Sequence, residues 1–212
     1  MSELFSSKNV KLLTDPLNDS NPITVQVLGI CSALAITVKL EPSVVMSISV
    51  IAVLAFSNVI ISLLRNSIPN RIRIIVQLTV IAFLVIMVDQ ILKAFLYDVS
   101  KQLSVFVGLI ITNCIIMGRL EAFALGNKPW PSFLDGVGNA AGYAVILIIV
   151  GFFRELLGSG TIWNYPVFDK IGLYEIGYEN NGSFILPSMA LIIVGIIIWV
   201  QRYRNRDLIE TK

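Results

Sequence analysis

Six long apolar segments constrain what this chain can fold into more than any other feature of its sequence. Crossing the hydrocarbon core of a bilayer takes roughly 20 apolar residues in a helix. Only helices and closed barrels satisfy every backbone polar group in lipid, and these segments lack the alternation of barrel strands. Charged residues make up 14% of the chain, against about 25% in a typical soluble domain. We therefore predict an all-α integral membrane protein with six transmembrane helices, at about 23–40, 43–64, 72–92, 102–125, 137–157 and 184–200.

Polar connections separate these segments and divide the chain. The predicted connections lie at Glu41–Pro42, at 66–70, at 127–131 and, longest of all, at about 158–183. The polar N-terminal residues hold no apolar core followed by a cleavage site, which predicts no removable signal peptide. We predict a cytoplasmic N-terminal segment at 1–22, a membrane domain at 23–200 and a cytoplasmic C-terminal tail at 201–212.

The distribution of basic residues predicts the orientation. Eleven of the 16 Lys and Arg residues would lie on the side of the two termini. The five on the other side would be Lys39, Lys93, Lys101, Arg154 and Lys170. Because cytoplasmic loops carry the excess of positive charge, both termini are predicted to be cytoplasmic. The net charge of +2 is small and spread over loops, which does not favour nucleic-acid binding.

The two halves of the membrane domain resemble each other. The matched residues are Cys31, Asn58 and Arg65 in the first half and Cys114, Asn139 and Arg154 in the second. The cysteine-to-asparagine spacings are 27 and 25 residues. A repeat of three spans inserts its second copy upside down, and such inverted repeats form sites near the bilayer midplane. We predict two inverted three-helix repeats, at about 23–92 and 102–200.

Cys31 and Cys114 are the only cysteines, and each lies near the middle of an apolar segment. Polar or flexible residues flank both: Gly29 and Ser32 in the first segment, Thr112 and Asn113 in the fourth. We therefore expect the first and fourth helices to be broken at the cysteines, with backbone N–H groups turned toward the thiolates. Irregular backbone at membrane depth is tolerated only where it is buried in protein or lines a cavity. A half-helix N-terminus there would favour negative charge.

Several roles for the cysteines remain open on the residues alone. A lone cysteine in a membrane helix is commonly a small apolar packing residue. A disulfide would be unusual at the membrane centre, away from an oxidising compartment. A structural zinc site needs four ligands, whereas two thiolates are half of what an iron–sulfur cluster takes. The sharper hypothesis is a metal or redox centre completed by a second subunit. The chain has no histidine, which excludes His-ligated haem, Rieske-type clusters and His-based catalysis within it.

Five charged residues lie in or beside the predicted spans: Asp89, Arg119, Glu121, Arg154 and Glu155. Intramembrane charges are functional candidates, although near helix ends long side chains reach out to the interface. We expect Arg154 and Glu155 to do the latter. Arg119 and Glu121 are predicted to form a structural ion pair at the break or a contact to a partner. None of the five is assigned an ion-carrying role.

Several motifs resemble a known family over nearly the whole chain. They are LGICSALA at 28–35, SVFVGLIITNCI at 104–115, MGRLEAFA at 117–124, DGVGN at 135–139 and GFFRELLGSG at 151–160. They resemble the D-subunit family of the bacterial sodium-translocating NADH:quinone oxidoreductase. The homologous E-subunit family of the Rnf complex, which links ferredoxin and NAD, typically has proline where this chain has Ser32. The stretch 138–143 also fits the sodium-pump family better.

The resemblance implies a specific site and specific partners. Cys31 and Cys114 would be metal ligands of one [2Fe–2S] cluster at the membrane centre, shared with two cysteines of a homologous E subunit of opposite orientation. NADH, flavins and the quinone, ubiquinone, would be bound by other subunits of a six-subunit complex in the bacterial inner membrane. The chain would carry electrons across the bilayer and would have no catalytic residue of its own. The alternatives are an Rnf-type subunit, a non-redox transporter and a scaffold subunit.

Overall fold

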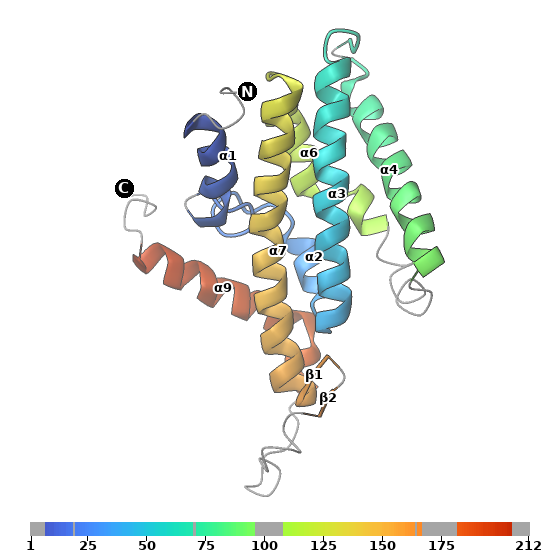
Figure 1. Ribbon diagram of the computed structural model, residues 1–212. Helices are drawn as coiled ribbons and strands as arrows, with labels where there is room; N and C mark the ends of the chain where they lie inside the picture. Colours follow the sequence, from blue (N-terminus) through green and yellow to red (C-terminus); the bar gives the residue numbers. More distant parts are fainter. Residues whose placement is uncertain are drawn as a thin grey trace, which may run out of the picture.

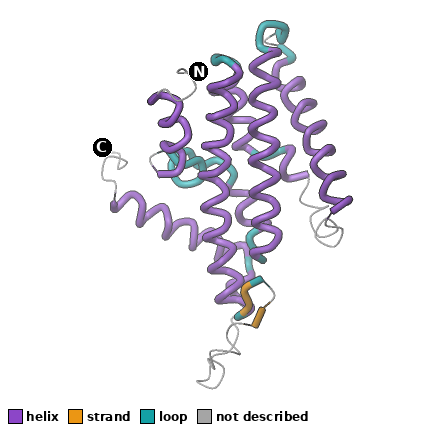
Figure 2. Tube along the Cα trace, in the orientation of Figure 1, coloured by secondary structure: helices purple, strands orange, loops and turns teal. Residues whose placement is uncertain are grey.

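In the described part of this computed structural model, the regular secondary structure is helical apart from one short hairpin (Figures 1 and 2). The structure describes residues 7–18, 20–69, 71–95, 108–163, 165–166 and 182–204. The α-helices are α1 (Ser7–Asn18), α2 (Ile30–Ile36), α3 (Leu40–Leu64), α4 (Arg73–Phe95), α6 (Cys114–Arg119), α7 (Pro129–Ser159) and α9 (Pro187–Arg204). The other elements are the π-helix η1 (Leu120–Ala124), the 3₁₀ helix η3 (Gly182–Ile185) and the strands β1 (Thr161–Ile162) and β2 (Tyr165–Pro166), which pair antiparallel.

Two long antiparallel helices, α3 and α7, form the centre of the molecule (Figure 1). Small residues line their contact. A Cβ atom added to Gly136 would lie 3.1 Å from the Cα of Ala55, and one added to Gly151 would lie 2.9 Å from the Oγ of Ser43. Because small side chains let two backbones approach closely, this interface favours tight helix packing in a membrane. Helix α4 packs on α3, and α1 packs on α7.

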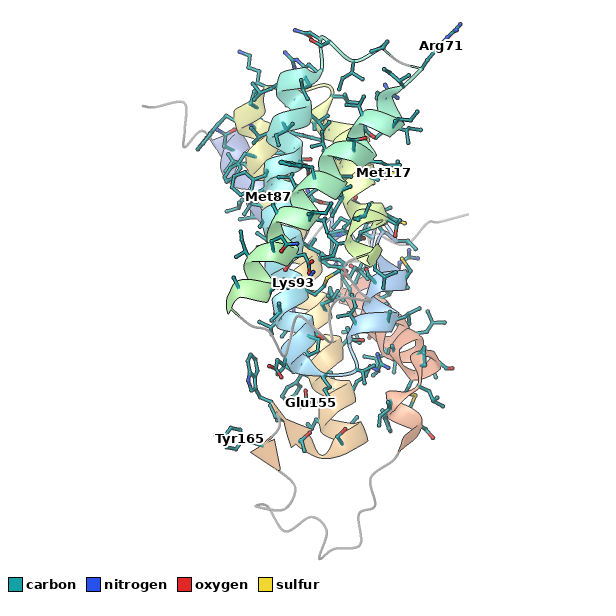
Figure 3. All side chains as sticks on the ribbon, turned by 90° about the vertical axis from the view of Figure 1, so that its right-hand side faces the viewer. Arg71, Met87, Lys93, Met117, Glu155 and Tyr165 are labelled. Atoms are coloured by element: carbon teal, nitrogen blue, oxygen red, sulfur yellow. The ribbon has the colours of Figure 1, made fainter. Side chains whose placement is uncertain are left out.

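Among the described residues, three helices are long and apolar enough to cross a membrane: α3, residues 73–94 of α4, and α7. The second, third and fifth predicted segments therefore form helices that are long and apolar enough to cross a membrane. In the sixth segment α9 carries two arginines in its last turn and runs obliquely to the long helices in Figure 1. Arg71 and Tyr165 mark opposite ends of the bundle in Figure 3.

The first predicted helix is mostly not helical. The chain forms turns and bends over 20–29, the loop between α1 and α2 that is teal in Figure 2. The seven-residue α2 starts after Gly29, whose φ of 77° is the left-handed conformation that glycine adopts easily. The predicted boundary at Glu41–Pro42 was wrong, because both residues lie in the first turn of α3. Proline is tolerated there since the first N–H groups of a helix have no intrahelical acceptor.

The fourth predicted helix is interrupted at Thr112 and Asn113. Residues 108–111 are helical, and Asn113 is extended, with φ −68° and ψ 121°. Its side-chain oxygen accepts a hydrogen bond from the backbone N–H of Ile115 (3.3 Å), which caps α6. The predicted break beside Cys114 is therefore confirmed, whereas in the first segment a loop stands where the helix before Cys31 was predicted.

The fifth predicted helix is longer than the sequence indicated, starting at Pro129 rather than at 137. The polar and glycine residues that hid its first two turns are buried, among them Ser132, Asp135 and Gly136. Helix α7 ends at Gly160, which has a φ of 67° and donates its N–H to the carbonyl of Leu156 (3.1 Å).

The N-terminal helix α1 was not predicted. It lies against α7, where a Cβ atom on Gly138 would be 2.5 Å from the carbonyl oxygen of Leu12. Gly142, four residues later, meets the carbonyl of Pro16 equally closely. These two glycines form the surface of α7 on which α1 packs. The side-chain amide of Asn21 adds a hydrogen bond to the carbonyl of Gly142 (3.0 Å).

Parts of several predictions fall outside the described residues. These parts are residues 1–6 of the N-terminal segment, 102–107 of the fourth helix, 167–181 of the long connection and 205–212 of the tail.

Candidate functional site

The two cysteines occupy equivalent places in the broken segments. Cys31 is the second residue of α2 and Cys114 is the first residue of α6. Both are exposed on the surface of this chain, and both are free thiols. Neither cysteine packs in the core of this chain.

Hydrogen bonds join the residues that flank the two cysteines. Ser32 follows Cys31, Asn113 precedes Cys114, and the side-chain nitrogen of Asn113 lies 3.4 Å from the Ser32 hydroxyl oxygen. Tyr143 of α7 joins both, with its hydroxyl 2.6 Å from the Ser32 hydroxyl and 3.4 Å from the Asn113 amide nitrogen. Each cysteine is one residue away from this contact, and consecutive Cα atoms are about 3.8 Å apart. The contact therefore holds the backbones of Cys31 and Cys114 close to each other.

Gly29 permits this close approach. A Cβ atom at this position would lie 2.9 Å from the Tyr143 ring and 3.2 Å from the Asn113 side-chain oxygen. Glycine is therefore required twice, for its positive φ and for the space beside the tyrosine.

A shallow cavity of about 400 Å³ lies beside Cys114, between α4 and α6. Its lining residues are Ile74, Gln77, Cys114, Met117, Gly118 and Glu121. Glu121 pairs with Arg73 of α4 and accepts a hydrogen bond from Gln77 (3.0 Å). Figure 3 shows Met117 on this side of the molecule. The opening beside the thiol leaves room for a group supplied from outside the chain.

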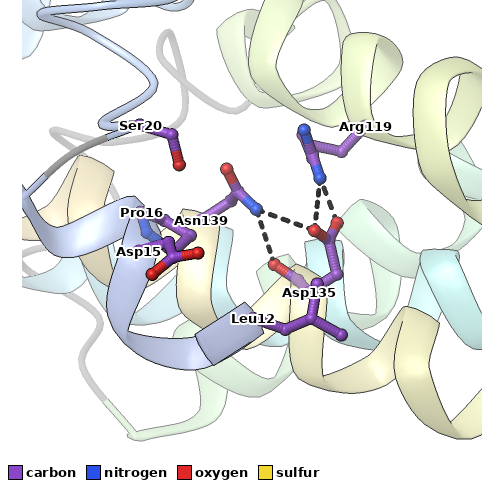
Figure 4. A pocket seen from close by; sticks show the side chains of 7 residues that line it. All are labelled: Leu12, Asp15, Pro16, Ser20, Arg119, Asp135 and Asn139. Atoms are coloured by element: carbon purple, nitrogen blue, oxygen red, sulfur yellow. Dashed lines mark hydrogen bonds and ion pairs between the residues drawn. The ribbon is translucent and has the colours of Figure 1, made fainter. Parts of the chain in front are cut away.

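The predicted ion pair between Arg119 and Glu121 was wrong. Arg119 forms a two-pronged ion pair with Asp135 of α7, which is 1% exposed and also accepts a hydrogen bond from the Asn139 side chain (3.1 Å). These residues line a polar cavity of about 100 Å³ under α1 (Figure 4). Side chains 16 residues apart meet because the chain reverses between η1 and α7. Asp135 belongs to a motif noted in the sequence, but its ion pair was not predicted.

The expectation that Arg154 and Glu155 reach out to the interface was also wrong, since both are buried. The Glu155 carboxylate accepts a hydrogen bond from the backbone N–H of Leu40 (2.5 Å) at the start of α3. Glu155, labelled in Figure 3, lies near the C-terminal end of α7. A carboxylate at that position offsets the partial positive charge of the α3 N-terminus. Asp89 pairs with Lys93 one turn later in α4.

Two arginines hold the ends of the broken helices, each from the opposite half of the chain. Arg154 donates to the carbonyl of Leu34 (3.1 Å) and to the hydroxyl of Thr37 (2.7 Å), at the C-terminal end of α2. Arg65 donates to the carbonyl of Asn127 (2.9 Å), just after η1. Cations are favourable at helix C-termini, so each half stabilises the cysteine-bearing segment of the other.

The asparagines matched between the halves make different contacts, one between α3 and α7 and one within α7. Asn58 of α3 donates to the carbonyl of Ser132 in α7 (2.9 Å), and Asn139 donates to the carbonyl of Asp135 (2.9 Å). Both are buried. Within the described part of the chain, no three His, Cys, Asp or Glu residues form a group that could hold a metal ion. A metal on Cys31 and Cys114 would therefore need further ligands from outside the described residues.

A model of the family described as "Rnf-Nqr subunit, membrane protein" matches residues 9–198. The chain belongs to the Rnf-Nqr family. The match covers α3, α4 and α7 and both cysteines. Membership of the Rnf-Nqr family agrees with the long apolar helices of the fold.

Relatives within the Rnf-Nqr family align over almost the entire chain. A protein from Psychromonas ingrahamii is 57% identical over 212 residues, covering 99% of this chain and 100% of the relative. One from Shewanella sp. W3-18-1 is 54% identical over 213 residues, covering 100% of both. One from Photobacterium profundum is 55% identical over 203 residues, covering 95% of this chain and 96% of the relative. Each relative is named as the D subunit of a Na(+)-translocating NADH-quinone reductase.

Proposed function

We propose that this chain is the D subunit of a sodium-translocating NADH:quinone oxidoreductase and that it carries electrons across the bilayer. Cys31 and Cys114 would supply two of the four thiolate ligands of a [2Fe–2S] cluster near the membrane midplane. The other two would come from a homologous E subunit of opposite orientation. Full-length relatives at 54–57% identity that are named as the D subunit support the proposal.

The observation that carries the proposal is that two exposed cysteines are linked by a buried hydrogen bond between the residues next to them. Thiols that only packed would lie in the core, whereas Cys31 and Cys114 are exposed at the surface. Their neighbours Ser32 and Asn113 are hydrogen-bonded to each other and buried. Since iron–sulfur clusters are held by four protein ligands, two presented thiols fit half of a ligand set.

The arrangement suits electron transfer across a membrane. The hydrocarbon core is about 30 Å thick, which is too far for one efficient step, and a centre at its midpoint divides the distance. The segments that carry the cysteines contact Tyr143, which lies near the middle of α7. The [2Fe–2S] cluster, when bound, would accept and release one electron, while this chain would hold two thiolates in place and exclude water.

The same features support an inverted repeat of two three-helix halves. We place both termini in the cytoplasm, on the bacterial inner membrane, because most basic residues would lie on that side. The central helices α3 and α7 run antiparallel, as equivalent helices of inverted copies must. Each half has a break beside its cysteine, and each contributes an arginine to the broken segment of the other. We propose six membrane segments on this basis, the first and fourth broken.

Iron analysis of the complex purified with its partner subunits tests the proposal. The wild-type subunit pair should contain two iron atoms from this cluster, whereas Cys31→Ala and Cys114→Ala should lose both and stop quinone reduction. Thr112→Ala is a matched control, since Thr112 is exposed beside the break and bonds only the carbonyl of Gly108. Full iron content and turnover in both cysteine variants would leave a non-redox transporter or a scaffold as the function.

A further inference from the structure

We propose that Tyr143 is a positioning residue that, through Ser32 and Asn113, fixes the separation of the two cysteine-bearing segments. The three side chains come from three different parts of the chain: Tyr143 from α7, Ser32 from α2 and Asn113 from the break before α6. The inference rests on the proposed cluster, because it assigns these residues a role in shaping the ligand site.

The hydrogen bonds between these residues have a single consistent direction. The Ser32 hydroxyl donates its one proton to the carbonyl of Gly29 (2.8 Å), so its oxygen can only accept from its other partners. The Tyr143 hydroxyl at 2.6 Å therefore donates to Ser32. The Asn113 side-chain nitrogen lies 3.4 Å from both the Ser32 oxygen and the Tyr143 oxygen. Because these two oxygens are only 2.6 Å apart, a single N–H of Asn113 is shared between them.

Two members of this network, Ser32 and Asn113, also fix the backbone next to a cysteine. By donating to the Gly29 carbonyl, Ser32 stabilises the turn that comes directly before Ile30, the first residue of α2. The remaining oxygen of Asn113 caps α6 by accepting from the N–H of Ile115. The network thus ties the start of one cysteine-bearing helix to the start of the other.

The network is closed to water. Tyr143, Ser32 and Asn113 are each 0% exposed. In a low-dielectric interior such bonds are stronger than in water, and the chain of donors polarises each member. Tyr143 serves as the fixed point because α7 is the longest helix of the described chain and packs along α3. The exposed thiols can bind a metal while the buried hydrogen bonds of the network hold their backbones in place.

Tyr143→Phe in the purified complex tests the inference, because it removes the hydroxyl and keeps the ring. Losing one net hydrogen bond should speed iron release to a chelator by roughly two- to tenfold. The electron paramagnetic resonance (EPR) lines of the reduced cluster should broaden, since the two ligands are no longer held at one separation. Tyr203→Phe is the matched control, as Tyr203 is an exposed tyrosine that lies against Trp199, and it should leave both measurements unchanged.

A second variant tests the same inference if the Tyr143→Phe complex assembles poorly. Ser32→Ala removes the hydroxyl that receives both other bonds without changing the ring packing, and it should produce the same two effects. Ser47→Ala is its control, because Ser47 is buried and bonds only within α3, to the carbonyl of Ser43.

The inference would be overturned if the assembled variants had the EPR line shape and the iron-release rate of the wild type. This holds even if less complex assembles, because a lower yield alone would mean that Tyr143 only stabilises the fold. The cysteine variants separate this outcome from failure of the proposed function. Iron retained in Cys114→Ala would refute the cluster itself, whatever Tyr143→Phe shows.

Discussion

Replacing Arg154 with methionine should destabilise the protein more than any other removal of a charge from it. The Arg154 side chain is 0% exposed and near the end of α7. Its guanidinium donates to the carbonyl of Leu34 and the hydroxyl of Thr37, and also to the carbonyls of Phe184 (3.2 Å) and Ile185 (2.6 Å). One side chain thus joins α2, α7 and η3.

The expected cost follows from these partners. Methionine fills a similar volume but leaves three partly buried carbonyl oxygens without this donor, while the Thr37 hydroxyl keeps its bond to the Ala33 carbonyl (2.5 Å). Each buried group left unsatisfied costs about 1–3 kcal/mol. Relief from burying a cation offsets part of this sum. We expect a net loss of about 3 kcal/mol, which corresponds to roughly 6–12 °C in the midpoint of thermal unfolding for a chain of this size.

Thermal unfolding of the purified complex, followed by a thiol-independent probe such as near-ultraviolet circular dichroism, measures this change. Arg65→Met is the matched control. Arg65 is only half-buried, and the Asn127 carbonyl that it binds also accepts from Ser62 (2.6 Å). Its replacement should cost about 1 kcal/mol. Equal midpoints for the two variants would refute the reasoning from buried partners.

Two further predictions concern α7. Gly138→Ala should loosen α1, because its Cβ would meet the carbonyl of Leu12 at 2.5 Å; we expect a loss of about 1–3 kcal/mol and faster proteolysis near the N-terminus. Gly195→Ala, with nothing within 4 Å of the new Cβ, should have neither effect. Asp135→Asn should leave the partly buried Arg119 without its anion and lower the unfolding midpoint, which thermal unfolding would show; Asp135→Asn combined with Arg119→Met should recover part of the loss, and no recovery would contradict a direct pair.

The membrane helices and both breaks were predictable because their causes are local in the sequence. Long apolar runs require helices in lipid, and α3, α4 and α7 follow from them. Gly29 and Asn113 mark the breaks because one adopts a positive φ and the other caps the following helix.

The remaining features depend on contacts between distant residues. Helix α1 is polar in composition, and only the surface of α7 at Gly138 shows why it lies against the bundle. Arg154 near a helix end is expected to reach water, yet carbonyls from two other segments surround it. Pairing of Arg119 with Asp135, rather than with Glu121, depends on the reversal of the chain between η1 and α7.

EPR of the reduced complex with and without Cys114 tests the central claim most directly. This cysteine is exposed at the surface and contributes no core packing, so its replacement by alanine should leave the complex assembled. We predict that the Cys114→Ala complex loses one [2Fe–2S] signal and two iron atoms, while signals from clusters of other subunits remain. An unchanged spectrum and iron content in the assembled Cys114→Ala complex would contradict the claim that this chain provides half of a shared cluster site.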